Sequence, residues 1–169
     1  MKHLTVQSPA RICLFGDHQD YLGLPVIACA VNRYIQVTAV ENDALQLRLS
    51  LPNTGEERVF DLSGEIVKTH NRDYLASALL VAKRYDCLFK KGFDVTIEGD
   101  VPINAGVSSS SAMVVGFMLF LMQAYGKHRF ISPQLIARMA YEAEVVEFDS
   151  PGGLMDQYTI AIGGLVHIN

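Results

Sequence analysis

The chain is poor in the residues that mark several common classes of protein. Its 169 residues include no tryptophan and only three cysteines, Cys13, Cys29 and Cys87. Their spacing matches neither a disulfide framework nor a zinc site, so we expect reduced, largely buried thiols of an intracellular protein. Internal repeats, low-complexity tracts and linkers are also absent. The sequence therefore predicts a single domain over residues 1–169.

Positive charge is also scarce. Fourteen Lys and Arg residues against 18 Asp and Glu residues give a net charge of -4. The chain therefore lacks the excess of positive charge that is typical of proteins that bind nucleic acid. The N-terminus lacks the apolar core of a signal peptide, and no lipidation signal is present. The longest apolar run, residues 113–122, is too short to span a bilayer. We expect a cytoplasmic protein with neither nucleic acid nor membrane as a partner.

Half of the residues are hydrophobic, which is enough for a substantial core. Strand-like alternation and helical periodicity divide the chain into elements. The expected strands cover residues 4–7, 11–15, 26–40, 45–49, 58–62, 92–101 and 165–168, and the expected helices cover 74–88, 110–125, 133–148 and 154–162. Strands come first, and helices then alternate with single strands. This order predicts an α+β fold with a mixed, mainly antiparallel sheet covered by helices on one face.

A loop of small residues, called the serine-rich loop below, precedes the most apolar helix. It runs from Pro102 to Ala112, and Gly106 is followed by Val107 and four serines, Ser108, Ser109, Ser110 and Ser111. Small side chains let a backbone approach a ligand, and a helix N-terminus attracts anions. The loop lacks the Gly-Lys-Ser/Thr of a Walker A motif and the glycine spacing of a dinucleotide fingerprint. Its pattern alone leaves two readings open, a phosphate cradle and a turn capped by serine.

Hydrogen-bond acceptor side chains gather in residues 15–23, a polar loop near the N-terminus that is called the acceptor loop below. Asp17, His18 and Asp20 lie within four residues of one another, shortly after Arg11. Charged acceptors form strong, directional hydrogen bonds, which suit the hydroxyls of a sugar. A solvated acidic loop is the simpler alternative. No further His or Cys is spaced to complete a zinc site.

Two carboxylates stand out near the C-terminus. Asp156 interrupts an otherwise apolar helix, where a carboxylate must be paired or functional. It is therefore a candidate base or hydroxyl-orienting group, with a salt-bridged helix residue as the alternative. Glu144, on the preceding helix, is a candidate metal ligand or a surface residue.

These segments together resemble the N-terminal half of the GHMP small-molecule kinases, and most closely the galactokinase-type sugar-1-kinases. Residues 10–21 are similar to the galactokinase signature G-R-x-N-x-I-G-E-H-x-D-Y. Residues 102–111 are similar to the phosphate loop P-x-x-x-G-L-x-S-S-A, and residues 143–157 to A-E-H-x-F-A-G-x-P-C-G-I-M-D-Q. Three motifs in the family order cover nearly the whole chain. The resemblance implies the N-terminal GHMP fold, with its ribosomal-protein-like βαββ core.

The resemblance also implies the site residues of an ATP-dependent kinase acting on the anomeric hydroxyl of a monosaccharide. Asp156 would orient or deprotonate that hydroxyl, and Arg11 would keep Asp156 ionised and stabilise the transferring phosphoryl group. Asp17, His18, Asp20 and the Gly153 backbone would hold the sugar. The loop from Pro102 through Gly106, Val107, Ser108, Ser109, Ser110 and Ser111 would bind ATP, and Ser110 and Glu144 would hold Mg²⁺.

Some positions depart from the family pattern. Cys13 stands for Asn, and Asp17 for a Glu that is longer by about 1.5 Å. Ser111 stands for Ala and is expected to disturb the helix start. These departures leave open whether the sugar is galactose, another hexose, a pentose or a uronic acid.

The family also has a second, C-terminal lobe, so we expect this chain to be an N-terminal half without useful kinase activity of its own. The strand at 165–168 ends the chain and still needs a neighbour, which supports this expectation. Two alternatives remain. One is another GHMP enzyme such as mevalonate kinase, which prefers Lys at position 11 and lacks the acceptor loop. The other is a non-catalytic sugar and nucleotide sensor.

Overall fold

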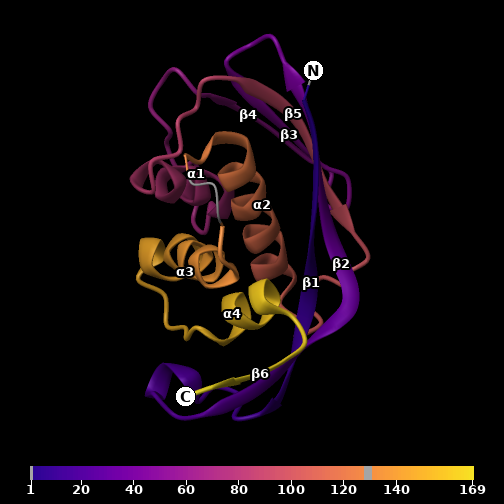
Figure 1. Cartoon of the computed structure of the whole chain (residues 1–169), viewed down its shortest axis with the longest axis vertical. Helices are drawn as coiled ribbons and strands as arrows, with labels where there is room; N and C mark the ends of the chain where they lie inside the picture. Colours follow the sequence, from indigo (N-terminus) through magenta and orange to yellow (C-terminus); the bar gives the residue numbers. More distant parts are fainter. Residues whose placement is uncertain (1, 128–130) are drawn as a thin grey trace.

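The computed structural model describes residues 2–127 and 131–169. In this part of the chain six strands form one sheet, and four α-helices cover one of its faces (Figure 1). The strands are β1 (His3–Phe15), β2 (Val26–Asn42), β3 (Gln46–Leu51), β4 (Glu56–Asp61), β5 (Gly92–Gly99) and β6 (Leu165–Ile168). Their order is β1-β2-β5-β3-β4, and β6 pairs with β2. Every pairing is antiparallel except that of β3 with β5, which confirms the predicted fold class.

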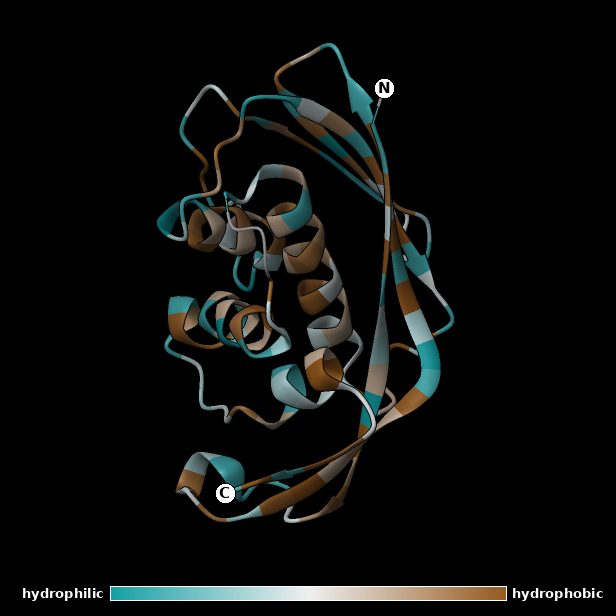
Figure 2. Ribbon diagram, in the orientation of Figure 1, coloured by the Kyte–Doolittle hydropathy of each residue, from teal (hydrophilic) through white to brown (hydrophobic). Residues whose placement is uncertain are grey.

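The helices form a single layer. They are α1 (Tyr74–Arg84), α2 (Ser109–Tyr125), α3 (Pro133–Glu144) and α4 (Met155–Ile162), with short 3-10 turns η1 (Asp20–Leu22) and η2 (Val146–Phe148). Helices α2 and α4 contact β1 and β2, while α1 and α3 pack on α2. Buried apolar residues of the sheet and of the helices form one hydrophobic cluster. Figure 2 shows hydrophobic residues along both layers. Of the helices in the described residues, none combines the length and apolarity needed to cross a bilayer.

Helix α2 lies at the centre of the core, as its uniformly apolar sequence predicts. Phe117, Met118 and Phe120 are fully buried. Its backbone comes so close to β1 that a Cβ at Gly116 would lie 2.6 Å from Ser8 Oγ. The same hydroxyl donates a 2.6 Å hydrogen bond to the carbonyl of Ala112. This contact fixes the start of α2, and with it the serine-rich loop, against β1.

The predicted division of residues 4–15 into two strands, separated at Ser8–Pro9, is wrong. Strand β1 runs through both residues, and the irregularity is absorbed by its partner strand. Pro9 pairs with Tyr34 and Ala10 with Val31, so that β2 bulges between them. A bulge of this kind accommodates proline, which has no backbone N–H to donate to the partner strand, and it bends the long strand pair.

Three other expectations about the elements change. Helix α1 ends at Arg84 rather than at residue 88. Helix α3 ends at Glu144 rather than near residue 148, because the chain tightens there into η2. Strand β6 finds a neighbour within the chain, since residues 165–168 pair with 26–29 of β2. The three cysteines are free, as predicted, but Cys87 is buried whereas Cys13 and Cys29 are half-buried.

Candidate active site

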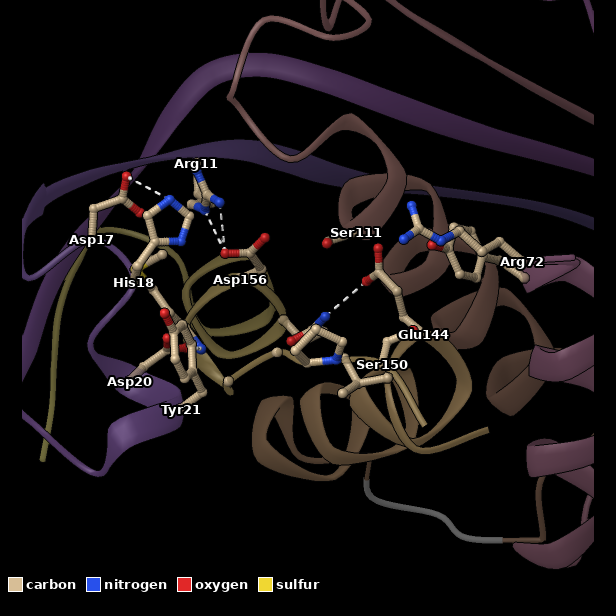
Figure 3. A pocket seen from close by; sticks show the side chains of 17 residues that line it. Arg11, Asp17, His18, Asp20, Tyr21, Arg72, Ser111, Glu144, Ser150 and Asp156 are labelled. Atoms are coloured by element: carbon tan, nitrogen blue, oxygen red, sulfur yellow. Dashed lines mark hydrogen bonds and ion pairs between the residues drawn. The ribbon is translucent and has the colours of Figure 1, made fainter. Parts of the chain in front are cut away.

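A cavity of about 280 Å³ lies between the acceptor loop, the start of α2 and the facing ends of α3 and α4 (Figure 3). It gathers residues that are far apart in the sequence. Its lining includes Arg11, Asp17, His18, Asp20, Arg72, Ser111, Glu144, Gly153, Asp156 and Gln157. Most of the predicted catalytic, sugar-binding and metal-binding residues therefore border one space.

Asp156 is held from both sides near the middle of this cavity. Arg11 donates to its Oδ1 through Nε and pairs with the same oxygen through Nη2, both at 2.7 Å. The hydroxyl of Ser108 donates to the other carboxylate oxygen, Oδ2. The side chains of Arg11 and Asp156 are 12% and 27% exposed, so this ion pair is partly shielded from water. A carboxylate held in this way has a fixed orientation and keeps acceptor capacity for a ligand hydroxyl.

The serine-rich loop is tied to β1 through its backbone. Arg11 donates from Nη1 to the carbonyl of Gly106 at 2.8 Å, and its own N–H donates to the carbonyl of Val107 at 3.1 Å. Ser108 adopts a left-handed conformation, φ 56°, at the N-cap of α2. A left-handed residue costs about 1–2 kcal/mol, which the bond to Asp156 helps to offset.

The serine cap, one of the two predicted readings of the loop, is wrong for the N-cap residue. The side chain of Ser108 makes no capping hydrogen bond, because its hydroxyl is turned toward Asp156. The first turn of α2 therefore presents its N–H groups without a cap from that residue. Uncapped N–H groups at a helix start are suited to an anion.

Glu144 is buried beside the start of α2, with 8% of its surface exposed. Ser110 Oγ donates to Glu144 Oε1 at 2.8 Å, and Gln157 Nε2 donates to Glu144 Oε2 at 2.7 Å. Burial raises the pKa of Glu144, against the lowering effect of hydrogen bonds from Gln157, Ser111 and Ser110. Ser111 lies buried in the first turn and does not disturb the helix, contrary to the expectation.

The acceptor loop divides into a fixed part and an exposed part. Asp20 accepts a hydrogen bond of 3.0 Å from the N–H of Met155, at the start of α4. Its carboxylate lies so close to Gly153 that a Cβ there would stand 1.9 Å from Asp20 Oδ2. Asp17 and His18, in contrast, are 65% and 82% exposed, and their side chains approach each other only to 3.7 Å. Both still border the cavity.

A second cavity, of about 370 Å³, lies on the other side of the serine-rich loop. Its lining is largely apolar and includes Ile35, Ile97, Val101, Ile103, Met113, Ser109 and Ser110. Pro102 lies exposed between two of these lining residues. Arg72 and Tyr74 border both cavities, so the two spaces share a wall.

Sequence reasoning gave no role to several residues of the site. Gln157 is 2% exposed, and its Oε1 lacks a partner among the described residues. A buried amide next to Asp156 in an apolar helix was a usable signal, because buried polar groups require partners. Arg72 and Tyr74 offered no such signal. Arg72 lies between β4 and α1, and Tyr74 begins α1, so both reach the site through the path that the chain takes into this helix.

The family descriptions that match the chain agree with this geometry. Residues 73–164 match the description "GHMP kinases N terminal domain". Residues 2–40 match the "Galactokinase galactose-binding signature". The first segment carries the serine-rich loop, Glu144 and Asp156, and the second carries Arg11 and the acceptor loop.

Curated relatives and solved structures are similar over almost the whole chain. The galactokinase of Pyrococcus furiosus is 33% identical over 96% of this chain, which spans 45% of that protein. The galactokinase of Glaesserella parasuis is 29% identical over 97% of the chain and 43% of its own length. The chain thus spans a little under half the length of these relatives.

Two solved structures share the fold at lower identity. Mevalonate kinase of Methanococcus jannaschii superposes with a TM-score of 0.84 at 23% identity, over 99% of this chain and 54% of that one. Galactokinase of Lactococcus lactis, complexed with galactose, gives 0.83 at 23% identity over 96% and 42%. Because the matched domain covers more than half of the chain, the protein belongs to the GHMP kinases, and its sequence is similar to the N-terminal half of galactokinases.

Proposed function

We propose that this chain is the N-terminal lobe of an ATP-dependent sugar kinase that phosphorylates the anomeric hydroxyl of a monosaccharide. The observation that carries the proposal is the position of Asp156. Its carboxylate is fixed by Arg11 and Ser108 between the acceptor loop and the serine-rich loop. A sugar hydroxyl bound by the first loop and a phosphate bound by the second would meet at this carboxylate.

The acceptor end of the cavity is the proposed sugar site. Asp17, His18 and Asp20 offer acceptors for sugar hydroxyls, and Gly153 borders the same cavity, with its backbone packed closely against the Asp20 carboxylate. Galactose is the first candidate, because the curated relatives are named galactokinases and residues 2–40 match their galactose-binding signature. The short Asp17 side chain keeps a related sugar possible as the preferred substrate.

Phosphoryl transfer requires positioning and charge stabilisation more than covalent chemistry by the protein. In the proposed reaction the anomeric oxygen attacks the γ-phosphorus, its proton passes to Asp156, and the bond to the β-phosphate oxygen breaks to release ADP. A dissociative transition state asks for little nucleophile activation. The main contribution of Asp156 is therefore orientation of the hydroxyl, and Arg11 stabilises charge on the transferring group.

The nucleotide is proposed to follow the serine-rich loop. The backbone of residues 106–110 and the uncapped start of α2 would hold its phosphates. The apolar cavity beyond Ser109 and Ser110 would take the nucleoside, because such a lining buries a flat base. This arrangement directs the terminal phosphate toward Asp156.

The residues around Glu144 fit a magnesium ion. A buried carboxylate needs a positive partner, and no ion pair within the described part of the chain supplies one to Glu144. Gln157 Oε1, close by, also lacks a partner there. Ser110 and Glu144 are oxygen ligands, and Mg²⁺ commonly takes one or two carboxylates together with phosphates and water. When bound, Mg²⁺ neutralises charge on the nucleotide phosphates.

Sugar-dependent release of ADP tests the proposal. The 169-residue chain and a polypeptide extended through a C-terminal lobe, as in the relatives, are assayed with Mg-ATP and a panel of hexoses, pentoses and uronic acids. We expect turnover from the extended protein and none from the 169-residue chain. Turnover by the short chain would show that this lobe suffices alone. Sugar binding without ADP release by the extended protein would favour the sensor.

The mevalonate kinase alternative is tested by adding mevalonate to the same panel. Shared fold alone supports this alternative, since the similarity to mevalonate kinases is at 23–24% identity. Arg11 and the acceptor loop count against it. Phosphorylation of mevalonate but of no sugar would overturn the sugar kinase.

A further inference from the structure

Arg72 stands on the wall between the two cavities, and no motif of the family resemblance includes it. It lies between β4 and α1, it is exposed, and its side chain borders both spaces. Figure 3 shows it on the same side of the cavity as Glu144 and Ser111, away from the acceptor loop. Arg11 is thus the cation beside Asp156, and Arg72 is the cation at the end of the cavity away from the acceptor loop.

The backbone at Arg72 is held in an unfavourable conformation. Its φ of 57° is in the left-handed region, which costs a residue with a side chain about 1–2 kcal/mol. Such a conformation persists where the surroundings fix it, and it is found most often at functional sites. Two sets of contacts fix it here, one on each side of Arg72.

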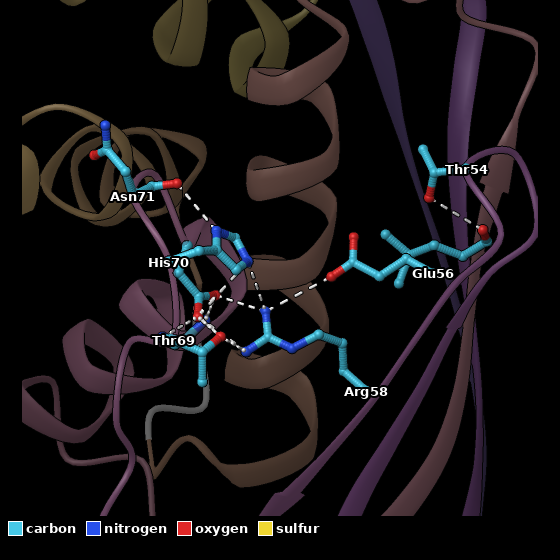
Figure 4. Close-up of polar contacts among 9 residues, drawn as sticks. Thr54, Glu56, Arg58, Thr69, His70 and Asn71 are labelled. Atoms are coloured by element: carbon cyan, nitrogen blue, oxygen red, sulfur yellow. Dashed lines mark hydrogen bonds and ion pairs between the residues drawn. The ribbon is translucent and has the colours of Figure 1, made fainter.

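The first set surrounds Asp73, the next residue along the chain, which is completely buried. Figure 4 shows Arg58, from β4, reaching toward Thr69 and His70 in the segment that precedes Asp73. Arg58 donates to both of its carboxylate oxygens, at 2.7 and 2.9 Å. Asp73 also accepts from the N–H groups of Thr69, at 2.9 Å, and Ala76, at 3.2 Å. The carboxylate next to Arg72 is therefore saturated by other donors and does not neutralise it.

The second set joins the preceding residues to η2. Lys68 Nζ pairs with Glu147 Oε2 at 2.7 Å and lies 4.7 Å from the centre of the Phe148 ring. Tyr74 packs edge-on against the same ring. Contacts on both sides of Arg72 thus fix the path of the backbone that carries it.

Within the described residues, no ion pair or side-chain hydrogen bond engages the guanidinium of Arg72, although carboxylates lie nearby. Asp156 is paired with Arg11, and Glu144 is bonded to Ser110 and Gln157. Burial and Glu144 raise the pKa of the Tyr74 hydroxyl, and Arg72 lowers it, so the charge of Arg72 acts on the shared wall. Its five donors remain available to an anion that crosses this wall.

We propose that Arg72 is a phosphate-binding residue. It binds the polyphosphate of the nucleotide at the point where the polyphosphate passes from the apolar cavity to the site of transfer. The assignment rests on the proposed function, because that function makes a nucleotide the ligand that spans both cavities. A guanidinium suits this role, since its planar fork donates two parallel hydrogen bonds to phosphate oxygens. Arg58 and Asp73 act as positioning residues for it.

Binding of tripolyphosphate, ATP and adenosine to the 169-residue chain tests the assignment. Titration calorimetry compares the unaltered chain with Arg72→Ala, Arg72→Lys and Arg138→Ala, the last a control at an arginine 69% exposed on α3. Charged hydrogen bonds of this kind predict a loss of about 10- to 100-fold for tripolyphosphate and ATP in Arg72→Ala. Adenosine binding should be unchanged, Arg72→Lys should recover part of the loss, and Arg138→Ala should behave as the unaltered chain.

Arg72→Gly separates a loss of phosphate binding from a folding defect, because glycine adopts a φ of 57° without steric cost. It should keep the melting temperature and show the same loss of tripolyphosphate binding. Equal losses for adenosine and tripolyphosphate would reveal a structural role and overturn the assignment. So would unchanged tripolyphosphate affinity in Arg72→Ala, or no binding by the unaltered chain at millimolar concentration.

Failure of the proposed function has a separate readout. If the extended protein releases no ADP with any sugar while Arg72→Ala still loses tripolyphosphate binding, the kinase proposal falls and the phosphate site stands. If sugar-dependent turnover is present and Arg72→Ala binds tripolyphosphate normally, the kinase proposal stands and the assignment of Arg72 falls.

Discussion

The two ends of the site cavity differ in how firmly their side chains are held. At the phosphate end Arg11, Asp156, Ser110 and Glu144 are all hydrogen-bonded to one another or to neighbours, and Glu144 is 8% exposed. At the acceptor end Asp17 and His18 are 65% and 82% exposed and meet only at 3.7 Å. Groups that stabilise a transition state act best when they are already oriented. Under the proposed function, the groups that act in phosphoryl transfer would be oriented before the substrates bind, whereas sugar selection would depend on contacts made when the sugar binds.

Asp156→Asn should give the largest effect, because it removes the centre of the firmly held end. An amide is a far weaker proton acceptor, and its NH₂ cannot accept from Arg11 or Ser108. In the extended protein we expect kcat to fall by about 10²- to 10⁴-fold, the range seen when a positioned proton acceptor is lost, because the hydroxyl loses the group that orients it as well as the group that takes its proton. Steady-state kinetics with the preferred sugar measure this change.

Ser108→Ala is the matched control for the orientation of the Asp156 carboxylate. It removes the hydrogen bond from the Ser108 hydroxyl and keeps the carboxylate itself. Its loss of kcat should be smaller than that of Asp156→Asn. A near-normal rate for Asp156→Asn would mean that another group receives or orients the hydroxyl, and that the firmly held end is not the centre of transfer.

The second prediction concerns the wall of the phosphate end. Asp73→Asn leaves Arg58 without its carboxylate, and breaking a buried pair typically costs about 3–5 kcal/mol of unfolding free energy. Chemical denaturation at pH 7 measures the loss. Asp43→Asn, at an exposed position between β2 and β3, is the control and should leave stability nearly unchanged.

This loss should depend on pH. Burial by itself raises the pKa of Asp73, but hydrogen bonds from Arg58, Thr69 and Ala76 outweigh it and hold the pKa well below its usual range. A carboxylate with a lowered folded pKa contributes stability above its unfolded pKa of about 3.9 and loses it as the pH falls further. The gap between unaltered and Asp73→Asn proteins should therefore be constant above about pH 5 and shrink below pH 4. A gap that persists undiminished in acid would contradict the charged pair.

The sequence predicted the fold well where each element carries its own signal. The alternation of β3 and β4, the Ser132–Pro133 start of α3 and the apolar α2 all read directly from local pattern. It failed where a distant partner decides the outcome. Strand β1 continues through Pro9 because β2 bulges opposite it, and no local rule reveals that bulge.

The site follows the same division. Family motifs predicted Arg11, Asp156, Ser110 and Glu144, and the fold brings each pair within hydrogen-bonding distance. The roles of these residues stay predictions until activity is measured. A turn capped by serine was one of two interpretations of the loop, and the tertiary contact of the Ser108 hydroxyl with Asp156 could not be seen in the local pattern. The position of Arg72 on the cavity wall was not predicted from the sequence. That position depends on the buried Arg58–Asp73 ion pair, which joins β4 to the start of α1 and has no local sequence signal.

Gly153→Ala tests the one part of the acceptor end that is fixed. The new Cβ would overlap the Asp20 carboxylate, whose bond to the Met155 N–H would be lost. A hydrogen bond to a charged group is worth about 1.5–3 kcal/mol, so KM for the sugar should rise about tenfold or more. The kcat should change little, because Asp156 and its partners are not displaced.

A double-mutant cycle with Asp20→Ala separates a specific effect from a general one. If Gly153→Ala acts through Asp20, the double variant should be no worse than Asp20→Ala alone. Additive losses would mean that the methyl group obstructs the sugar itself or distorts α4.

Asp17→Asn should have the smallest effect, and it tests the exposed part of the acceptor end most directly. A side chain that is 65% exposed contributes little to folding, so the unfolding free energy should stay within about 0.5 kcal/mol. The KM for the preferred sugar should rise by a few fold, because an amide accepts more weakly than a carboxylate, and kcat should be unchanged. Asp17→Glu extends the carboxylate by about 1.5 Å, so a protein that prefers another sugar should shift toward galactose. A loss of more than 1 kcal/mol in Asp17→Asn would show that this loop is as firmly held as the phosphate end. In that case the preference for a sugar would be built into the unliganded lobe.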